Sequence, residues 1–156
     1  MKKIILGITT IACLAIASCS SDDNSTQDNP VVESPSKKFE GKWKMVTGIV
    51  IYNGQTQTQD LKPGDCDYDF YDLKSNGSKD EVYHETENNC TETNWVGTWN
   101  YNADENTITA IDSDDNYTVV FEIIEFSTNT MKVKLIEDDG VNPEDSGFEI
   151  YSILQR

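Results

Sequence analysis

The chain has 156 residues, of which 28 are acidic and 12 are lysine or arginine, so its formal net charge at pH 7 is −16. A surface this negative repels phosphates and anionic headgroups, which argues against nucleic acid as a partner. The length corresponds to a single domain of ordinary size.

Residues 1–18 have the layout of a secretory signal peptide. Lys2 and Lys3 form a short basic region, residues 4–16 are mostly apolar, and Ala17 and Ser18 are small residues of the kind found before a cleavage site. The apolar run is too short to cross a hydrocarbon layer of about 30 Å, which takes about 20 helical residues. We therefore expect a cleaved leader rather than a permanent membrane helix.

The segment Ile16-Ala17-Ser18-Cys19 resembles the lipobox of bacterial lipoproteins. This resemblance implies cleavage before Cys19 and lipid on its thiol, so that the membrane is a partner through an N-terminal anchor of two or more acyl chains. Residues 20–23, Ser-Ser-Asp-Asp, also resemble the acidic tag of some Gram-negative lipoproteins, with a generic polar linker as the alternative. The expected location is the cell envelope, anchored to the outer membrane.

The segment after the anchor is polar. Residues 20–36 contain almost nothing to bury, so we expect residues 19–37 to form the lipidated cysteine and a disordered tether, and residues 38–156 to form the folded domain. Cleavage would remove two lysines and no acidic residue, which leaves a formal charge of −18.

Two of the four cysteines remain after processing. Cys13 leaves with the leader and Cys19 takes the lipid, while Cys66 and Cys90 form an even pair in an oxidising compartment. This predicts a disulfide between Cys66 and Cys90. A metal site on the two thiols is the alternative, and the single histidine of the chain argues against it.

From residue 38 onward, short alternating segments rich in β-branched and aromatic residues are separated by turn residues, which is typical of an all-β domain. The pair Asn76-Gly77 between two such segments is a strong hairpin signal. Eight strands are predicted, over residues 39–52, 67–73, 78–87, 94–101, 107–112, 117–126, 130–137 and 148–155.

Short connections predict that successive strands pair antiparallel in an up-and-down order. Eight such strands can close into a β-barrel, which removes free edges. A two-sheet β-sandwich is the alternative, because the number of strands does not decide closure.

Gly41-Lys42-Trp43, at the start of the first predicted strand, resembles the Gly-x-Trp signature of lipocalins. The similarity to lipocalin-like domains of Gram-negative lipoproteins extends to the ordered set Cys66, Phe70, Gly77, Cys90 and Gly97-Thr98-Trp99 and to the ending 151–156. It implies a closed barrel whose floor is plugged by Trp43 and covered by Arg156, in a cation–π contact of about 0.5–2 kcal/mol.

In a barrel, the inner face of the strands is also the wall of any cavity, so an aromatic stripe can line a pocket. His84, the only histidine, shares a strand face with Val82 opposite Tyr83, which makes it a candidate for the interior. The candidate ligand-binding residues are Trp95, Trp99, Tyr101, His84, Phe70 and Phe121.

The sequence carries no nucleophile elbow, phosphate-binding loop or His-Glu-x-x-His motif. The run 112–116 begins like a calcium loop, but Tyr117 stands where the loop needs glycine and Ile123 where it needs glutamate. We therefore predict no enzymatic activity, no cofactor and no metal site.

Two functions remain. The first is a lipocalin-like lipoprotein that binds a small hydrophobic or amphipathic ligand at the cell envelope. The alternative is a structural or interaction lipoprotein with a filled barrel. An open cavity inside the barrel would favour ligand binding, and a filled interior would favour the structural role.

Overall fold

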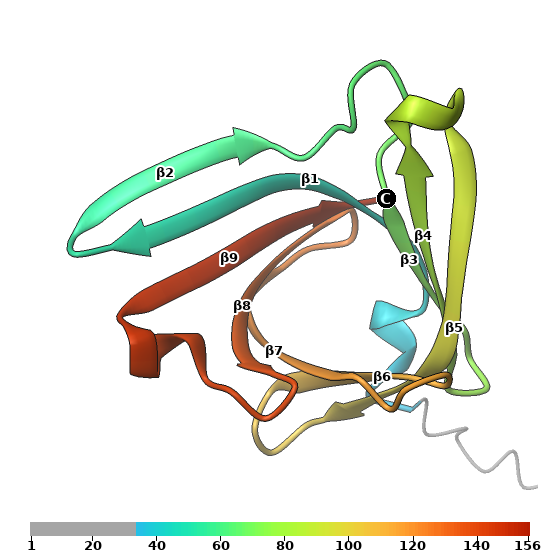
Figure 1. Cartoon of the computed structure of the whole chain (residues 1–156). Helices are drawn as coiled ribbons and strands as arrows, with labels where there is room; N and C mark the ends of the chain where they lie inside the picture. Colours follow the sequence, from blue (N-terminus) through green and yellow to red (C-terminus); the bar gives the residue numbers. More distant parts are fainter. Residues whose placement is uncertain (1–33) are drawn as a thin grey trace, which may run out of the picture. The chain divides into compact units, whose positions relative to one another are not determined.

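A computed structural model describes residues 34–156, which form the barrel in Figure 1. The predicted signal peptide, Cys19 and most of the predicted tether lie outside these residues. Within residues 34–156, no helix has the length and apolar character needed to cross a membrane.

The described chain is built from strands and three short 3-10 turns: η1 (Lys37–Phe39), η2 (Thr86–Asn88) and η3 (Pro143–Ser146). The strands are β1 (Gly41–Tyr52), β2 (Gln55–Asp60), β3 (Phe70–Leu73), β4 (Ser78–Glu85), β5 (Thr91–Asn102), β6 (Thr107–Asp112), β7 (Thr118–Phe126), β8 (Thr130–Asp138) and β9 (Phe148–Gln155).

Eight of these strands close into an antiparallel barrel. From β3 to β9 each strand pairs with the next, and β1 completes the circle by pairing with both β3 and β9. The prediction of an eight-stranded up-and-down barrel is confirmed, and the β-sandwich alternative is wrong because β1 and β9 pair along most of their length.

The predicted hairpin between β3 and β4 shows how local sequence sets the register. The amide of Gly77 donates to the carbonyl of Lys74, and the side chain of Asn76 accepts from the amide of Ser78. Gly77 has a φ of 81°, in the left-handed region that glycine adopts without steric cost. The turn therefore fixes the pairing of β3 with β4.

Strand β2 was not predicted. It pairs with the second half of β1, Thr47–Tyr52, on the side where β3 pairs with the first half, Gly41–Lys44. All six residues of β2 are exposed, so the strand carries no hydrophobic alternation and is held by its backbone pairing. The two halves of β1 thus have different neighbours, and β1 and β2 extend together away from β3 (Figure 1).

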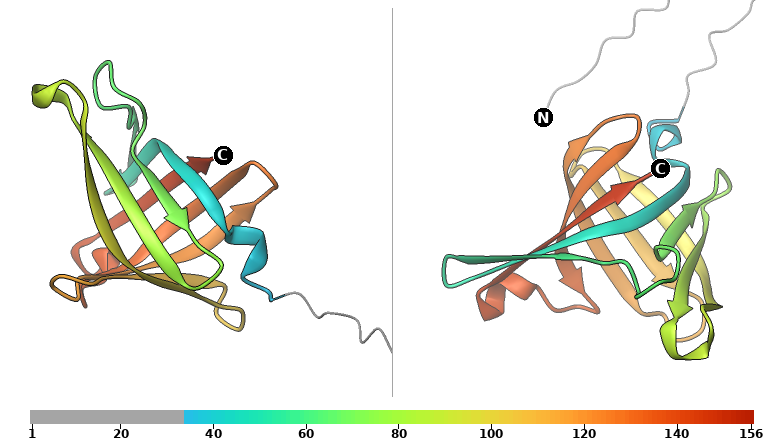
Figure 2. Two further views of the ribbon diagram at one scale, coloured as in Figure 1. Left: turned by 90° about the vertical axis from the view of Figure 1, so that its right-hand side faces the viewer. Right: turned by 90° about the horizontal axis from the view of Figure 1, so that it is seen from above.

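The two ends of the barrel differ. Turn η1 and the C-terminus lie at one end, which we call the floor, and the β6–β7 and β8–β9 connections lie at the opposite end, which we call the mouth (Figure 2). Phe39 of η1 is fully buried, and η1 begins at Lys37, one residue before the predicted domain start at residue 38. The hydrophobic core occupies the floor half, with Phe39, Trp43, Leu73, Trp99, Ile108, Ile123, Met131, Val133 and Leu154.

Candidate functional site

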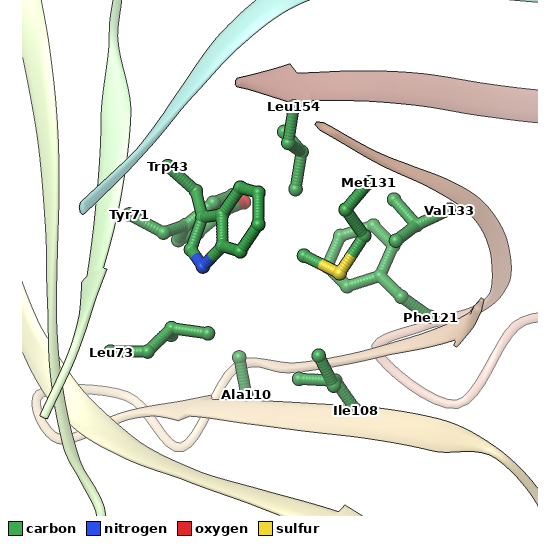
Figure 3. A pocket seen from close by; sticks show the side chains of 9 residues that line it. All are labelled: Trp43, Tyr71, Leu73, Ile108, Ala110, Phe121, Met131, Val133 and Leu154. Carbon is green, nitrogen blue, oxygen red and sulfur yellow. The ribbon is translucent and has the colours of Figure 1, made fainter. Parts of the chain in front are cut away.

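The floor half of the barrel interior is filled by apolar side chains. Nine residues from β1, β3, β6, β7, β8 and β9 converge there (Figure 3). The space left between them is about 20 Å³. A water molecule needs about 10–15 Å³ on this measure, so this chamber has room for about one. The lining residues are Trp43, Tyr71, Leu73, Ile108, Ala110, Phe121, Met131, Val133 and Leu154.

Trp43 and Arg156 lie together at the floor. The indole of Trp43 is fully buried, and its Nε1 donates to the carbonyl of Phe39 at 2.7 Å. The guanidinium carbon of Arg156 lies 4.1 Å from the centre of the Trp43 ring. Nη2 of Arg156 also donates to the carbonyls of Lys38 and Glu40, at 2.7 and 2.8 Å. The structure thus contains the contact that the family resemblance implies.

The mouth half contains an open chamber of about 200 Å³, which we call the mouth chamber. Its wall combines aromatic, aliphatic and charged side chains from β3 to β8 and from the connection before β7. It shares Tyr71, Ala110 and Phe121 with the filled floor. The other lining residues are Lys79, Glu81, Tyr83, Trp95, Asp112, Tyr117, Val119, Leu135 and Asp138.

A buried ion triad lies between the apolar floor and the mouth. Nζ of Lys79, whose side chain is 1% exposed, donates to Oε2 of Glu81 at 2.8 Å and to Oδ1 of Asp112. Burial acts to lower the pKa of Lys79, but the hydrogen bonds and charges of Asp112 and Glu81 outweigh it, so the pKa is raised. The ammonium therefore stays charged and is held by two carboxylates.

Tyrosine hydroxyls bind the carboxylates of the mouth chamber. Tyr83 donates to Oε1 of Glu81, and Tyr117 donates to Oδ1 of Asp138. Burial, followed by the negative charge of Glu81, raises the pKa of Tyr71 and Tyr83 above the usual value. The hydrogen bond to Asp138 is the main cause that raises the pKa of Tyr117 to about 12. These phenols therefore stay neutral at physiological pH.

Of the six predicted ligand-binding residues, two line the mouth chamber. Trp95 is 48% exposed at its rim and lies 5.6 Å from Tyr83 between ring centres, while Phe121 lies deeper. Trp99 and Tyr101 are on the same face of β5 but nearer the floor. There, Nε1 of Trp99 donates to the carbonyl of Lys74 at 2.9 Å and the ring of Tyr101 packs on Phe39. The predicted stripe is divided because β5 runs the full length of the barrel.

His84 and Phe70, predicted as candidate ligand-binding residues, do not face the interior, so the expected inward position of these two side chains is wrong. Tyr83 and Tyr71, their neighbours in sequence, line the mouth chamber, and alternation along the strands turns His84 and Phe70 to the outer face. The ring of Phe70 is covered by Lys42, whose Nζ lies 3.6 Å from the ring centre. Sequence alternation separated the two faces of β4 but did not show which face was inside.

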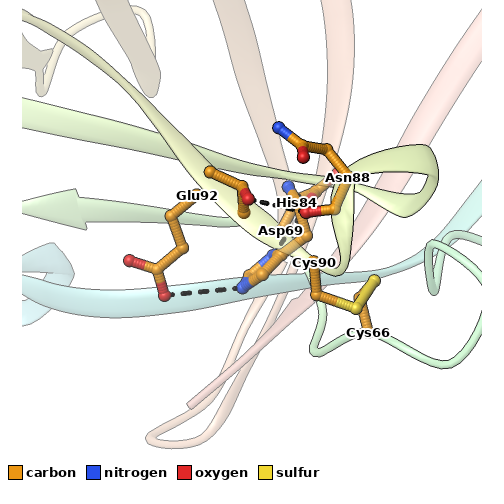
Figure 4. Close-up of a disulfide and its surroundings, with 7 residues drawn as sticks. Cys66, Asp69, His84, Asn88, Cys90 and Glu92 are labelled. Carbon is orange, nitrogen blue, oxygen red and sulfur yellow. Dashed lines mark hydrogen bonds and ion pairs between the residues drawn. A yellow bond between two sulfur atoms is a disulfide. The ribbon is translucent and has the colours of Figure 1, made fainter.

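On the outer face, His84 lies between two carboxylates near the disulfide (Figure 4). Its backbone amide donates to Oδ1 of Asp69 at 2.7 Å, its Nδ1 lies 3.1 Å from the same oxygen, and its Nε2 lies 3.6 Å from Oε1 of Glu92. This arrangement ties β4 to the segment before β3 and places His84 outside the mouth chamber.

The predicted disulfide between Cys66 and Cys90 is confirmed, with the two Cα atoms 5.4 Å apart. It joins the connection between β2 and β3 to the connection between β4 and β5. Cys66 is buried, and the two linked segments precede β3 and follow β4 (Figure 4).

The charged residues of the mouth chamber were not among the residues predicted from the sequence. Lys79, Glu81 and Tyr83 alternate along the predicted strand 78–87, and Asp112 ends the predicted strand 107–112. A lysine and a glutamate on the inward face of a strand are a signal for a buried ion pair, but the inward face had not been identified. Within residues 34–156, no three His, Cys, Asp or Glu side chains are grouped so that they could hold a metal ion.

A family model described as a lipocalin-like domain matches residues 39–133. Among solved structures, the chain is similar to a lipocalin-like protein from Bacteroides uniformis ATCC 8492, with 17% identity, a TM-score of 0.49 and coverage of 76% of this chain and 98% of that one. An uncharacterized protein from Bacteroides eggerthii DSM 20697 has 14% identity, a TM-score of 0.47 and coverage of 75% and 98%. A bovine odorant binding protein, a deswapped triple mutant, has 13% identity, a TM-score of 0.40 and coverage of 76% and 74%. No curated protein matches the chain significantly.

Proposed function

Because the chain belongs to the family of lipocalin-like domains, we propose that it binds a small amphipathic ligand in the mouth chamber. One contrast supports this proposal: the purely apolar floor is filled, with about 20 Å³ left, whereas the mouth chamber has about 200 Å³. An apolar pocket with a few placed polar groups is the usual form of a small-molecule site. The polar wall of the mouth chamber favours an amphipathic ligand over a purely hydrophobic one.

We further propose that the protein acts at the cell envelope, anchored to the outer membrane through lipid on Cys19. The support is the leader sequence and the Ile16-Ala17-Ser18-Cys19 segment. In cells that express the full chain and are supplied with labelled palmitate, the protein is expected to take up the label, and Cys19→Ala is expected to abolish it. Cys13→Ala, in the leader, is the matched control and should leave the labelling unchanged.

The lipocalin-like fold is typically non-catalytic, and we propose a binding role without catalysis. His84, the residue that would be the natural acid–base group, lies on the outer face beside Asp69 and Glu92, away from the mouth chamber. The filled floor is the observation that favours the alternative, a structural barrel. The measurement below separates the two.

The test uses the processed chain with Cys19→Ala and 2-phenylethanol as a neutral amphipathic probe. Titration followed by NMR is expected to shift the indole N–H signal of Trp95, at the rim, and to leave that of Trp43, in the floor, unchanged. Val119→Trp, on the chamber wall, should abolish the shift by filling the space. Val120→Trp, its neighbour on the outer face of β7, should preserve it. Failure of the probe to bind anywhere in the barrel, together with failure of the charged probes named below, would leave the structural alternative.

A further inference from the structure

The charges inside the mouth chamber do not balance. Its wall carries one ammonium, Lys79, and three carboxylates, those of Glu81, Asp112 and Asp138. Lys79 is shared between Glu81 and Asp112. Asp138 accepts a hydrogen bond from Tyr117, and within residues 34–156 it takes part in none of the ion pairs. The formal charge of the chamber wall is therefore negative by two.

The ammonium of Lys79 is not available to bind an anionic ligand, because two carboxylates already neutralise it. The side chain of Lys79 is 1% exposed, and its Nζ lies between two carboxylates. Among the described residues that line the chamber, an anion would meet the carboxylate of Asp138 and no accessible positive group. Burial is the main cause that raises the pKa of Tyr71 and Tyr83, and the negative charge of Glu81 raises both further; the pKa of Tyr117 is raised mainly by its hydrogen bond to Asp138 and also by the charge of that carboxylate. The chamber therefore disfavours anionic ligands.

The aromatic wall adds attraction for a cation. Tyr71, Tyr83, Trp95, Tyr117 and Phe121 all line the chamber, and ring faces attract positive groups within about 6 Å of their centres. Nζ of Lys79 already lies 5.9 Å from the centre of the Tyr71 ring. The same rings supply apolar surface for the uncharged part of a ligand.

We propose that the mouth chamber binds small organic amines, with the ammonium beside Asp138 and Tyr117 and the apolar part against Trp95 and Phe121. The inference rests on the proposed function and names the ligand class of the same site. It favours an organic cation over a metal ion because the carboxylates of residues 34–156 form no group suited to metal ligation. The volume of about 200 Å³ suits a ligand of on the order of ten non-hydrogen atoms.

Three probes of similar size and different charge test this inference. They are phenethylammonium, 2-phenylethanol and phenylacetate, titrated calorimetrically at pH 7 into the processed chain with Cys19→Ala. The amine is expected to bind about tenfold more tightly than the alcohol, and the carboxylate most weakly. This ranking needs no variant within the barrel. Equal affinities for amine and alcohol would overturn the amine inference and leave the proposed function standing, whereas absence of binding by all three would overturn both.

Asp138→Asn tests the position of the ammonium. It should weaken phenethylammonium about fivefold to tenfold and leave 2-phenylethanol within about twofold, because only the amine uses the lost charge. Asp104→Asn, in the exposed β5–β6 turn at the floor, removes the same charge far from the mouth and should change neither affinity. An equal loss of amine affinity in both variants would show a general effect of net charge and contradict the placement at Asp138.

Discussion

At the scale of single residues, Arg156 contributes to the floor through its guanidinium. The group covers the face of Trp43 and donates to two carbonyls at the entry to β1. Arg156→Ala is expected to lower the free energy of unfolding by about 1–2 kcal/mol, through loss of the cation–π contact and of two exposed hydrogen bonds. Urea unfolding followed by tryptophan fluorescence measures this. Gln155→Ala, at the exposed preceding position, should change it by less than about 0.5 kcal/mol; equal effects of the two substitutions would argue against a specific role of Arg156.

Lys79 is expected to contribute more to the stability of the fold than a surface lysine does. Lys79→Met leaves the buried carboxylates of Glu81 and Asp112 without a cation, which is expected to cost about 3–5 kcal/mol of stability. Lys74→Met, on the same hairpin, removes a partly exposed lysine paired with Asp80 and should destabilise the protein much less. The urea midpoints of the two variants provide the comparison. A similar, small loss in both would mean that water reaches the triad.

At the scale of elements, β5 and β6 approach closely at Gly97. A Cβ there would lie 2.0 Å from the carbonyl oxygen of Ile111 and 3.0 Å from Cε of Lys79, and the backbone contact cannot be relieved by a side-chain rotation. Gly97→Ala is therefore expected to destabilise the barrel by about 2 kcal/mol or more. At Gly48, in β1, the nearest atom is the movable Cδ2 of Leu61 at 3.1 Å, so Gly48→Ala should have a smaller effect. Thermal unfolding of both variants tests whether Gly97→Ala is the more destabilising. A larger loss of stability in Gly48→Ala would contradict the prediction.

The accuracy of the strand predictions follows from how each strand is buried. Segments 107–112 and 148–155 match β6 and β9 residue for residue, since alternation and turn residues mark both. Strand β2 carries only polar, exposed residues, so nothing in its sequence distinguishes it from a loop; it exists because β1 extends beyond β3 and offers a free edge.

The candidate site was less predictable than the fold. Two residues of the wall, Trp95 and Phe121, were predicted because alternating aromatic and apolar residues along a strand can be recognised in the sequence. The ion triad joins Lys79 to Asp112 across 33 positions, and only the closed barrel brings them together. His84 was misplaced for a related reason: alternation divides a strand into two faces, but the identity of the inner face depends on the other strands.

At the scale of the whole molecule, the free energy of unfolding should decrease at alkaline pH. The pKa values of Tyr71, Tyr83 and Lys79 are raised in the folded state, the tyrosines from 10.0 and the lysine from 10.5. Above pH 10 the unfolded chain therefore binds fewer protons than the folded one, so the free energy of unfolding falls as the pH rises. Between its unfolded-state and folded-state pKa values, each such group lowers the free energy of unfolding by about 1.4 kcal/mol per pH unit. Below its unfolded-state pKa it contributes no slope.

Urea unfolding between pH 8 and pH 11.5 measures this dependence. Tyr83→Phe removes one of the titrating groups and should reduce the slope above pH 10 by about 1.4 kcal/mol per pH unit. The curves of the two proteins should run parallel below pH 10. A slope that Tyr83→Phe leaves unchanged would mean that the decrease comes from general charge repulsion in this acidic chain instead.

Both ends of the described chain lie at the floor (Figure 2), and the residues that line the mouth chamber belong to the opposite half of the barrel. Arg156 contacts the carbonyl of Lys38, so the two ends are also neighbours. A fluorescent label or a sensor surface attached next to residue 34 or residue 156 therefore joins the floor end of the barrel. In the proposed binding role, the mouth chamber lies away from both of these positions, so an immobilised barrel should bind the probes with the same affinity as the free one.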